Sequence, residues 1–68
     1  MTTGEKIKKA RTSKGLTQKE LGALVGLPDD RIRKYELNIR TPKRELLQKI
    51  ADHTGFSVEF FTDHLIDS

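Results

Sequence analysis

The chain has 68 residues, which is enough for one small domain with a thin core, so a single domain over residues 1–68 is predicted. It contains no cysteine and no apolar run near the roughly 18 residues of a membrane span, which excludes disulfides and makes a cytoplasmic protein the default expectation. Residues 1–44 hold 12 Lys and Arg against 5 Asp and Glu, whereas residues 45–68 hold 1 against 5, so we expect a polyanion to dock on one side.

The first predicted helix covers residues 4–14. Thr2 and Glu5 have the spacing of a capping box, in which each side chain accepts a backbone N–H of the first turn. Ile7 lies on the expected inner face, and Gly15 ends the helix.

The second predicted helix begins after Thr17, which forms a capping box with Glu20. Its apolar stripe has i, i+3, i+4 spacing and consists of Leu21, Leu24 and Val25. Gly26 follows as a left-handed C-cap, and Gly22 leaves room for a neighbouring helix to approach closely.

The third predicted helix covers residues 28–36, with Pro28 at its first position, where the missing N–H costs nothing. Asp29 and Asp30 fall in the first turn, where the helix dipole favours negative charge. Ile32 and Tyr35 form an inner face, and the outer face is basic. The short turn after Gly26 therefore predicts a helix-turn-helix that presents this helix to a partner.

The remaining chain is predicted to form a loop and two more helices. Asn38 in the loop can adopt a positive φ, a fourth helix covers residues 43–53, and Ser57 caps a short fifth helix. We expect an all-α fold of five short helices. Its core is predicted to contain Ile7, Leu21, Leu24, Ile32, Leu46, Ile50 and Phe60.

Two segments carry a family resemblance. The runs LTQKELGALVGLPDDRIRKYELNIRTP and LLQKIADHTGFSVEFF closely resemble the phage repressor/Cro-like helix-turn-helix family, also called the xenobiotic response element family. The resemblance covers about Ile7 to Phe61 and implies a lambda-repressor-like DNA-binding domain with the helix-turn-helix at helices 2 and 3. It implies a sequence-specific transcriptional regulator, usually dimeric and acting as a repressor. Because one recognition helix covers few bases, we expect a homodimer on a palindromic operator in double-stranded DNA, bound through residues 28–36.

The resemblance also implies which residues read bases. The groove-facing positions with side chains able to contact base edges are Asp29, Asp30, Arg33 and Lys34. The two aspartates depart from the neutral polar residues usual there. An alternative is that Asp29–Arg33 and Asp30–Lys34 are ion pairs with i, i+4 spacing along the helix.

Other residues are assigned to the phosphate backbone or to the fold. Gln18, at the start of the second helix, is implied to hold a phosphate. Weaker candidates for phosphate contact are Lys19, Arg31, Asn38, Arg40, Lys43 and Arg44. By the same resemblance, Arg11 and Glu36 form a structural ion pair.

Apolar residues beyond those that the core requires predict a dimer surface. Leu37 and Ile39 are hard to bury after the third helix, and Phe61 and Leu65 exceed one inner stripe on the fifth. These four residues are the predicted interface.

Catalysis finds no support in the sequence. His53 and His64 lie in separate helices and are expected to be surface residues, and no catalytic grouping is present. We expect no enzyme activity, metal, cofactor, small-molecule ligand or membrane partner. The alternative function is an antitoxin or protein-interaction adaptor with the same fold, which the acidic C-terminal third and the Asp pair would suit.

Overall fold

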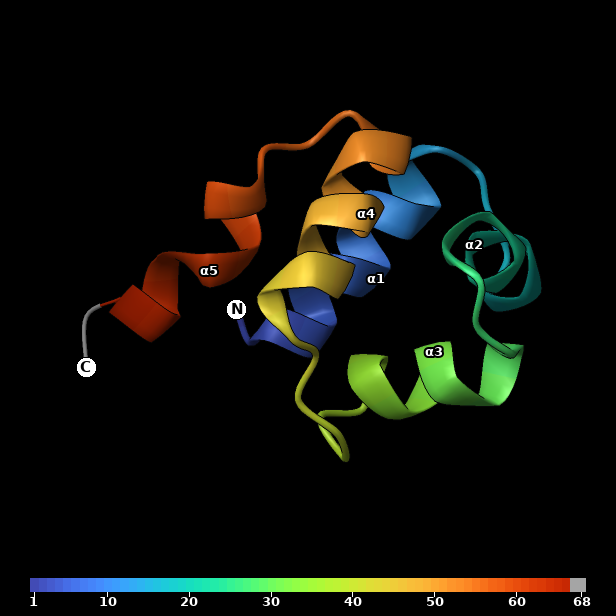
Figure 1. Cartoon of the computed structure of the whole chain (residues 1–68), viewed down its shortest axis with the longest axis horizontal. Helices are drawn as coiled ribbons and strands as arrows, with labels where there is room; N and C mark the ends of the chain where they lie inside the picture. Colours follow the sequence, from blue (N-terminus) through green and yellow to red (C-terminus); the bar gives the residue numbers. More distant parts are fainter. Residues whose placement is uncertain (67–68) are drawn as a thin grey trace.

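The computed structural model describes residues 1–66, with side chains described for residues 1–62, and this part of the chain forms five helices and no strand (Figure 1). The helices are α1 (Thr3–Ser13), α2 (Gln18–Val25), α3 (Asp29–Glu36), α4 (Arg44–Thr54) and α5 (Val58–Ile66). The predicted all-α fold is confirmed. Within residues 1–66, no helix is long and apolar enough to cross a membrane.

The helices surround one core. Figure 1 shows α1 and α4 side by side at the centre, α2 and α3 on one side of them and α5 on the other. Every helix contributes at least one buried apolar side chain, so no helix is peripheral to the core. The fully buried large apolar side chains are Ile7, Leu21, Ile32, Leu47, Ile50 and Phe61.

The helix ends follow the predicted signals. Both capping boxes form: Thr2 accepts from the Glu5 amide at 3.2 Å, and Thr17 accepts from the Glu20 amide at 3.0 Å. Gly26 ends α2 in the left-handed conformation with φ 78°. These local hydrogen bonds need no tertiary partner, which is why the sequence alone predicts them.

The start of α3 differs from the prediction. Pro28 is the N-cap residue and not the first helical residue, because its backbone is extended, with ψ 156°. Its carbonyl accepts the first hydrogen bond of the helix, from the Arg31 amide at 3.1 Å. No side chain caps this end of the helix.

The predicted core position of Leu24 is wrong. Leu24 is 45% exposed, whereas Leu21, Gly22 and Val25 are buried. Because neighbouring helical residues are rotated by about 100°, a face centred between Leu21 and Gly22 turns Leu24 to its edge. Packing of the following turn against Gly22 therefore sets the rotation of α2.

The burial of two phenylalanines in α5 differs from the prediction. Phe61 is fully buried and cannot form the predicted dimer surface, whereas Phe60 is only partly buried at the edge of the core. Val58, Phe61 and Thr62 have i, i+3, i+4 spacing and define the buried face. The side chains of His64 and Leu65, for which the sequence also made predictions, lie outside the described residues.

Candidate nucleic-acid interface

The turn between α2 and α3 is held by a close backbone contact. The Leu27 amide donates to the Gly22 carbonyl at 2.8 Å. A Cβ atom on Gly22 would overlap the carbonyl oxygen of Leu27. Gly22 is thus required for the approach that the sequence predicted, although its neighbour is the turn and not a second helix.

A buried ion pair fixes the C-terminal end of α3. Arg11 Nε donates to Glu36 Oε2 at 2.6 Å, and the two side chains are only 11% and 3% exposed. The same guanidinium donates to the Leu16 carbonyl at 2.8 Å, so the pair joins α1, α3 and the segment before α2. The predicted pair of Arg11 and Glu36 is present, and its geometry satisfies the carboxylate in a low-dielectric site.

Gln18 belongs to the same network. Its Nε2 donates to Glu36 Oε1 at 3.1 Å, and the side chain is half-buried at the first residue of α2. The N-terminus of α2 and the end of α3 are therefore connected by side chains as well as by the turn. The backbone amides at the start of α2 are the groups that could hold a phosphate there.

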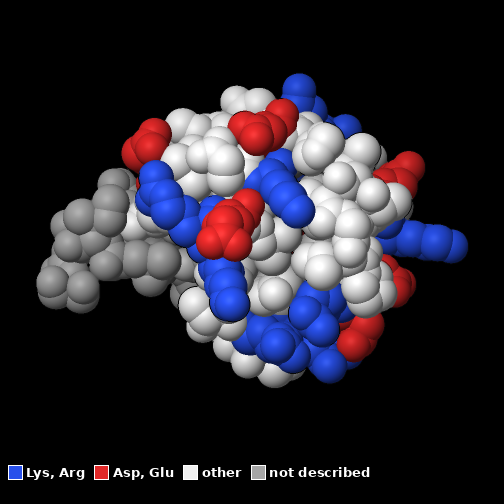
Figure 2. Space-filling model, viewed as in Figure 1, with Lys and Arg blue, Asp and Glu red and all other residues white. Residues whose placement is uncertain are grey.

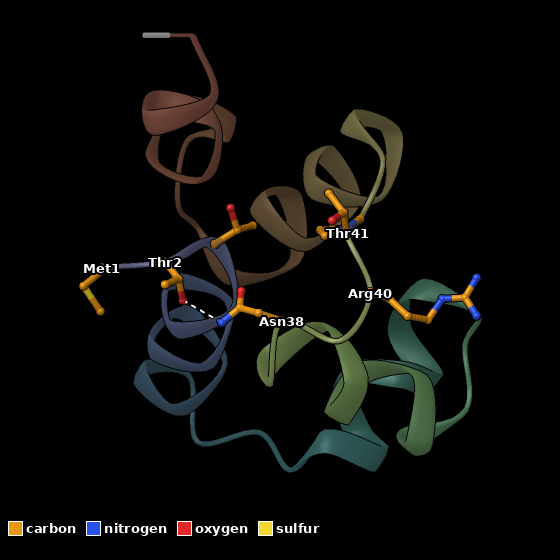
Figure 3. A pocket seen from close by; sticks show the side chains of 7 residues that line it. Met1, Thr2, Asn38, Arg40 and Thr41 are labelled. Carbon is orange, nitrogen blue, oxygen red and sulfur yellow. Dashed lines mark hydrogen bonds between the residues drawn. The ribbon is translucent and has the colours of Figure 1, made fainter. Parts of the chain in front are cut away.

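Asn38 connects the end of α3 to the start of α1. It has a positive φ of 60°, as predicted, and this conformation turns the chain back after the helix. Its Oδ1 accepts from the Gly4 amide at 3.1 Å, and its Nδ2 donates to Thr2 Oγ1 at 3.0 Å. In Figure 3 the Asn38 amide faces Thr2, whereas Arg40 points away from both. Both polar atoms of the Asn38 side chain therefore have a partner within the protein, and its phosphate contact stays a prediction.

The outer face of α3 carries an internal charge pairing. Arg33 Nη2 lies 2.8 Å from Asp30 Oδ1, and Lys34 Nζ lies 3.2 Å from Asp30 Oδ2. Of the two predicted pairs, Asp30–Lys34 forms, but Arg33 pairs with Asp30 and not with Asp29. Asp29 Oδ1 instead accepts from the Asp30 amide at 2.9 Å, because the uncapped first turn leaves that N–H available.

The two cations also affect the acidity of Asp30. The hydrogen bond from Arg33, followed by the one from Lys34, holds the pKa of the Asp30 carboxyl below its ordinary value. All three side chains are accessible on the molecular surface. Guanidinium and ammonium groups can donate to guanine, and a carboxylate can accept from a base amino group.

Beside this face lies a basic groove, which we define by Arg31, Arg40, Lys43 and Lys49. The groove has a volume of about 410 Å³, and its other lining residues are one carboxylate, Glu45, together with Val25, Leu27, Tyr35, Thr41 and Leu46. Within residues 1–62, none of its four cations forms an ion pair. Figure 2 shows Lys and Arg side chains gathered along the edge where Figure 1 places α3 and the loop after it.

Three of the residues predicted to contact phosphate line this groove, namely Arg31, Arg40 and Lys43. Lys19 and Arg44 are exposed at the first turns of α2 and α4. Leu37 and Ile39, predicted for the dimer surface, are 56% and 63% exposed in the loop after α3.

Two residues that matter for this surface were missed by sequence reasoning. Lys49 adds a fourth cation to the groove from the middle of α4. A Cβ atom on Gly4 would overlap the carbonyl oxygens of Tyr35 and Glu36, so α1 can approach the end of α3 only with glycine there. A glycine inside a helix is unfavourable by about 1 kcal/mol relative to alanine, and this was the available signal.

In the part of the chain whose side chains are described, no group of three or more acidic or His side chains could hold a metal ion.

The geometry defines a helix-turn-helix with an accessible charged second helix and an adjoining basic groove. The model of the helix-turn-helix family matches residues 7–61, and the chain belongs to this family.

One relative and one solved structure extend the comparison. The chain is 35% identical over 57 residues to the SPbeta prophage-derived uncharacterized HTH-type transcriptional regulator YonR of Bacillus subtilis (strain 168). The match covers 84% of this chain and 53% of that protein, so the chain spans about half the length of the relative. The fold is similar to the crystal structure of the P22 c2 repressor protein in complex with synthetic operator 9T in the presence of Tl+. That match has a TM-score of 0.82 and 24% identity, and it covers 90% of this chain and 92% of that chain.

Proposed function

We propose that this protein is a sequence-specific DNA-binding transcriptional regulator, acting as a repressor in the cytoplasm, and that it is a binding protein and not an enzyme. The observation that carries the proposal is the accessible outer face of α3 beside a groove whose four cations have no ion-pair partner among residues 1–62. The relative named as a transcriptional regulator and the similar fold of a repressor seen with its operator support it.

The two surfaces have separate roles in this proposal. Asp29, Asp30, Arg33 and Lys34 contact base edges in the major groove, because only base edges carry sequence information. The phosphate backbone is held by the basic groove together with Gln18, Lys19, Asn38 and Arg44. Phosphate contacts position the helix but do not read the sequence.

Salt dependence of DNA binding tests the proposal. Neutralising about five phosphates per subunit predicts a slope of about −4.5 in a plot of log affinity against log salt concentration, from about −0.9 per contact. The ligand is a duplex selected from a random library, and binding is followed by fluorescence anisotropy. Failure to enrich any duplex, or a slope near zero, would exclude the proposed function.

Two substitutions separate base reading from backbone contact. Arg33→Ala should lose discrimination at one position of each half-site, by roughly 5-fold to 100-fold, while affinity for random DNA falls little. Gln18→Ala should weaken binding to all duplexes by a similar factor. If both variants lose affinity equally for all duplexes, Arg33 contacts the phosphate backbone of DNA and does not read a base.

We further propose that two copies bind a palindromic operator, paired through Leu37 and Ile39. Two recognition helices about 34 Å apart would read two half-sites, and exposed apolar side chains are available to join the subunits. Leu37→Ser with Ile39→Lys should abolish the dimer measured by sedimentation equilibrium, with an unchanged circular dichroism spectrum. An unchanged dimer would exclude these two residues as the interface.

A further inference from the structure

The outer face of α3 carries both cations, which attract DNA, and carboxylates, which repel it. Arg33 and Lys34 provide two positive charges, and Asp29 and Asp30 provide two negative charges, so this face carries no net charge. The basic groove beside it carries four cations against the single carboxylate of Glu45, so it remains positive. Attraction to the phosphate backbone therefore comes from the groove, to which Arg31 of α3 contributes, and from the other phosphate-contacting cations, whereas the outer face of α3 adds none.

The charges on this face are also paired individually. Each oxygen of the Asp30 carboxylate is occupied by a different cation, Oδ1 by Arg33 at 2.8 Å and Oδ2 by Lys34 at 3.2 Å. One carboxylate thus engages both cations that could contact DNA from this face. Asp29 lies one residue earlier and equally at the surface, but its Oδ1 accepts from the Asp30 amide.

These pairs can be exchanged on binding. Ion pairs between exposed side chains contribute little to stability, because water solvates the separated charges almost as well. When α3 enters a major groove, water is removed and Asp30 faces a strongly negative surface. The carboxylate is then accommodated only where it meets a hydrogen-bond donor, and the donors in the major groove are the amino groups of cytosine N4 and adenine N6.

From this geometry we propose that Asp30 is a specificity-determining residue that masks Arg33 and Lys34 on random DNA and releases them at a site offering a base amino group. On a random sequence, the masked cations add no phosphate contacts and the carboxylate is repelled. At the correct site, the amino group replaces one cation as a partner of Asp30, and that cation becomes free to donate to a neighbouring base. The inference rests on the proposed function and explains how an acidic recognition helix could favour one sequence.

Asp30→Asn is the test, and Asp29→Asn is its matched control. Both changes remove one negative charge from the same turn of α3, but only the first removes the partner of Arg33 and Lys34. With Asp30→Asn, affinity for a random duplex should rise and the salt slope should steepen by about 0.9 to 1.8, equivalent to one or two phosphate contacts. The ratio of affinities for the selected and random duplexes should fall by roughly 10-fold or more. Asp29→Asn removes the same charge without freeing a cation, so it should change the salt slope clearly less than Asp30→Asn does.

Base analogues identify the amino group. In the selected duplex, each cytosine is replaced in turn by a pyrimidin-2-one nucleotide, and each adenine by a purine nucleotide without the N6 amino group. One replacement should lower wild-type affinity by roughly 10-fold and leave the affinity of an Asp30→Ala variant unaffected, because alanine has no acceptor for the amino group whereas asparagine would keep one. The base type at that position distinguishes cytosine from adenine as the partner.

The outcomes separate this inference from the proposed function. Equal effects of Asp29→Asn and Asp30→Asn on slope and selectivity, with DNA binding intact, would overturn the masking role alone. Base analogues that lower the affinities of the wild-type chain and of the Asp30→Ala variant equally would have the same consequence. A wild-type chain that enriches no duplex would overturn the proposed function and this inference with it.

Discussion

At its last turn, α3 is held by the buried Glu36 carboxylate, which Arg11 and Gln18 both contact. At its first turn, the helix begins after Pro28 without a side-chain cap, and Asp29 and Asp30 are exposed. One end of an eight-residue helix is thus part of the core network, and the other end is open to solvent.

The difference separates two requirements of recognition. The orientation of a recognition helix must be fixed, because a misplacement of about 1 Å spoils a hydrogen-bonding site. The groups that meet the partner must be able to change partners, which exposed pairs do at little cost. In this protein the two requirements are met at opposite ends of the same helix.

Removing the buried carboxylate should have the largest effect. Glu36→Ala leaves Arg11 largely buried without its partner, and we expect a loss of about 3–5 kcal/mol in the free energy of unfolding. Urea unfolding followed by circular dichroism measures it. Glu45→Ala removes an exposed carboxylate on α4 and should cost less than about 1 kcal/mol.

A double-mutant cycle sharpens the same prediction. If the two side chains act as a pair, Arg11→Ala combined with Glu36→Ala should cost clearly less than the sum of the single losses. Additive losses would mean that each residue contributes through packing alone.

Gly4→Ala tests the fixed end from the opposite side. In an unobstructed helix, alanine in place of glycine stabilises by about 1 kcal/mol. Here the added methyl group meets the carbonyl oxygens of Tyr35 and Glu36, so we expect a loss of about 1–3 kcal/mol instead. Thermal unfolding measures the change: a lower midpoint temperature for Gly4→Ala supports the close contact, and a higher one contradicts it. Lys9→Ala, at an exposed position of α1, reports the effect of helix propensity alone.

Asn38, just after the fixed end of α3, stabilises the fold through its side-chain hydrogen bonds and through its tolerance of a positive φ. Asn38→Ala and Asn38→Gly separate these two contributions. Both remove the hydrogen bonds to Gly4 and Thr2, worth about 1 kcal/mol together or somewhat more. Only alanine adds the strain of a positive φ, about 1 kcal/mol, because glycine adopts that conformation freely. The alanine variant should therefore unfold at lower urea concentration. Equal midpoints would show that the backbone at this position relaxes.

The same comparison explains which features the sequence could predict. Capping boxes and glycine C-caps depend on residues within one turn, so Thr2, Thr17 and Gly26 were predicted correctly. The ion pair between Arg11 and Glu36 is distant in the sequence and was available only through the family resemblance.

The errors arise where a helix can rotate or a side chain can choose between partners. Leu24 and Phe60 lie at the edges of the buried faces, whereas Phe61 is fully buried, and tertiary packing decides which side of each apolar stripe faces the core. Asp30 has one basic residue three positions later and another four positions later. Helical spacing allows an ion pair with either and does not predict that Asp30 pairs with both. The contact of Gly4 with the end of α3 joins segments about 30 residues apart, which periodicity cannot reveal.

The smallest expected effect concerns the open end of α3 and is read as a pKa. Arg33, followed by Lys34, lowers the pKa of Asp30 from its ordinary value of 3.8, so the charged carboxylate is favoured in the folded state. The resulting stabilisation is present above pH 3.8 and is lost as the pH falls through the lower folded-state value. Arg33→Ala and Lys34→Ala should each raise the pKa of Asp30 toward 3.8, because each removes a hydrogen bond and a positive charge that favour the carboxylate. The carboxyl carbon chemical shift of Asp30, followed by NMR across the acid range, measures each value. A pKa of Asp30 that neither substitution moves would mean that the two pairs do not persist in solution, and the open end of α3 would then present its cations to DNA without any mask.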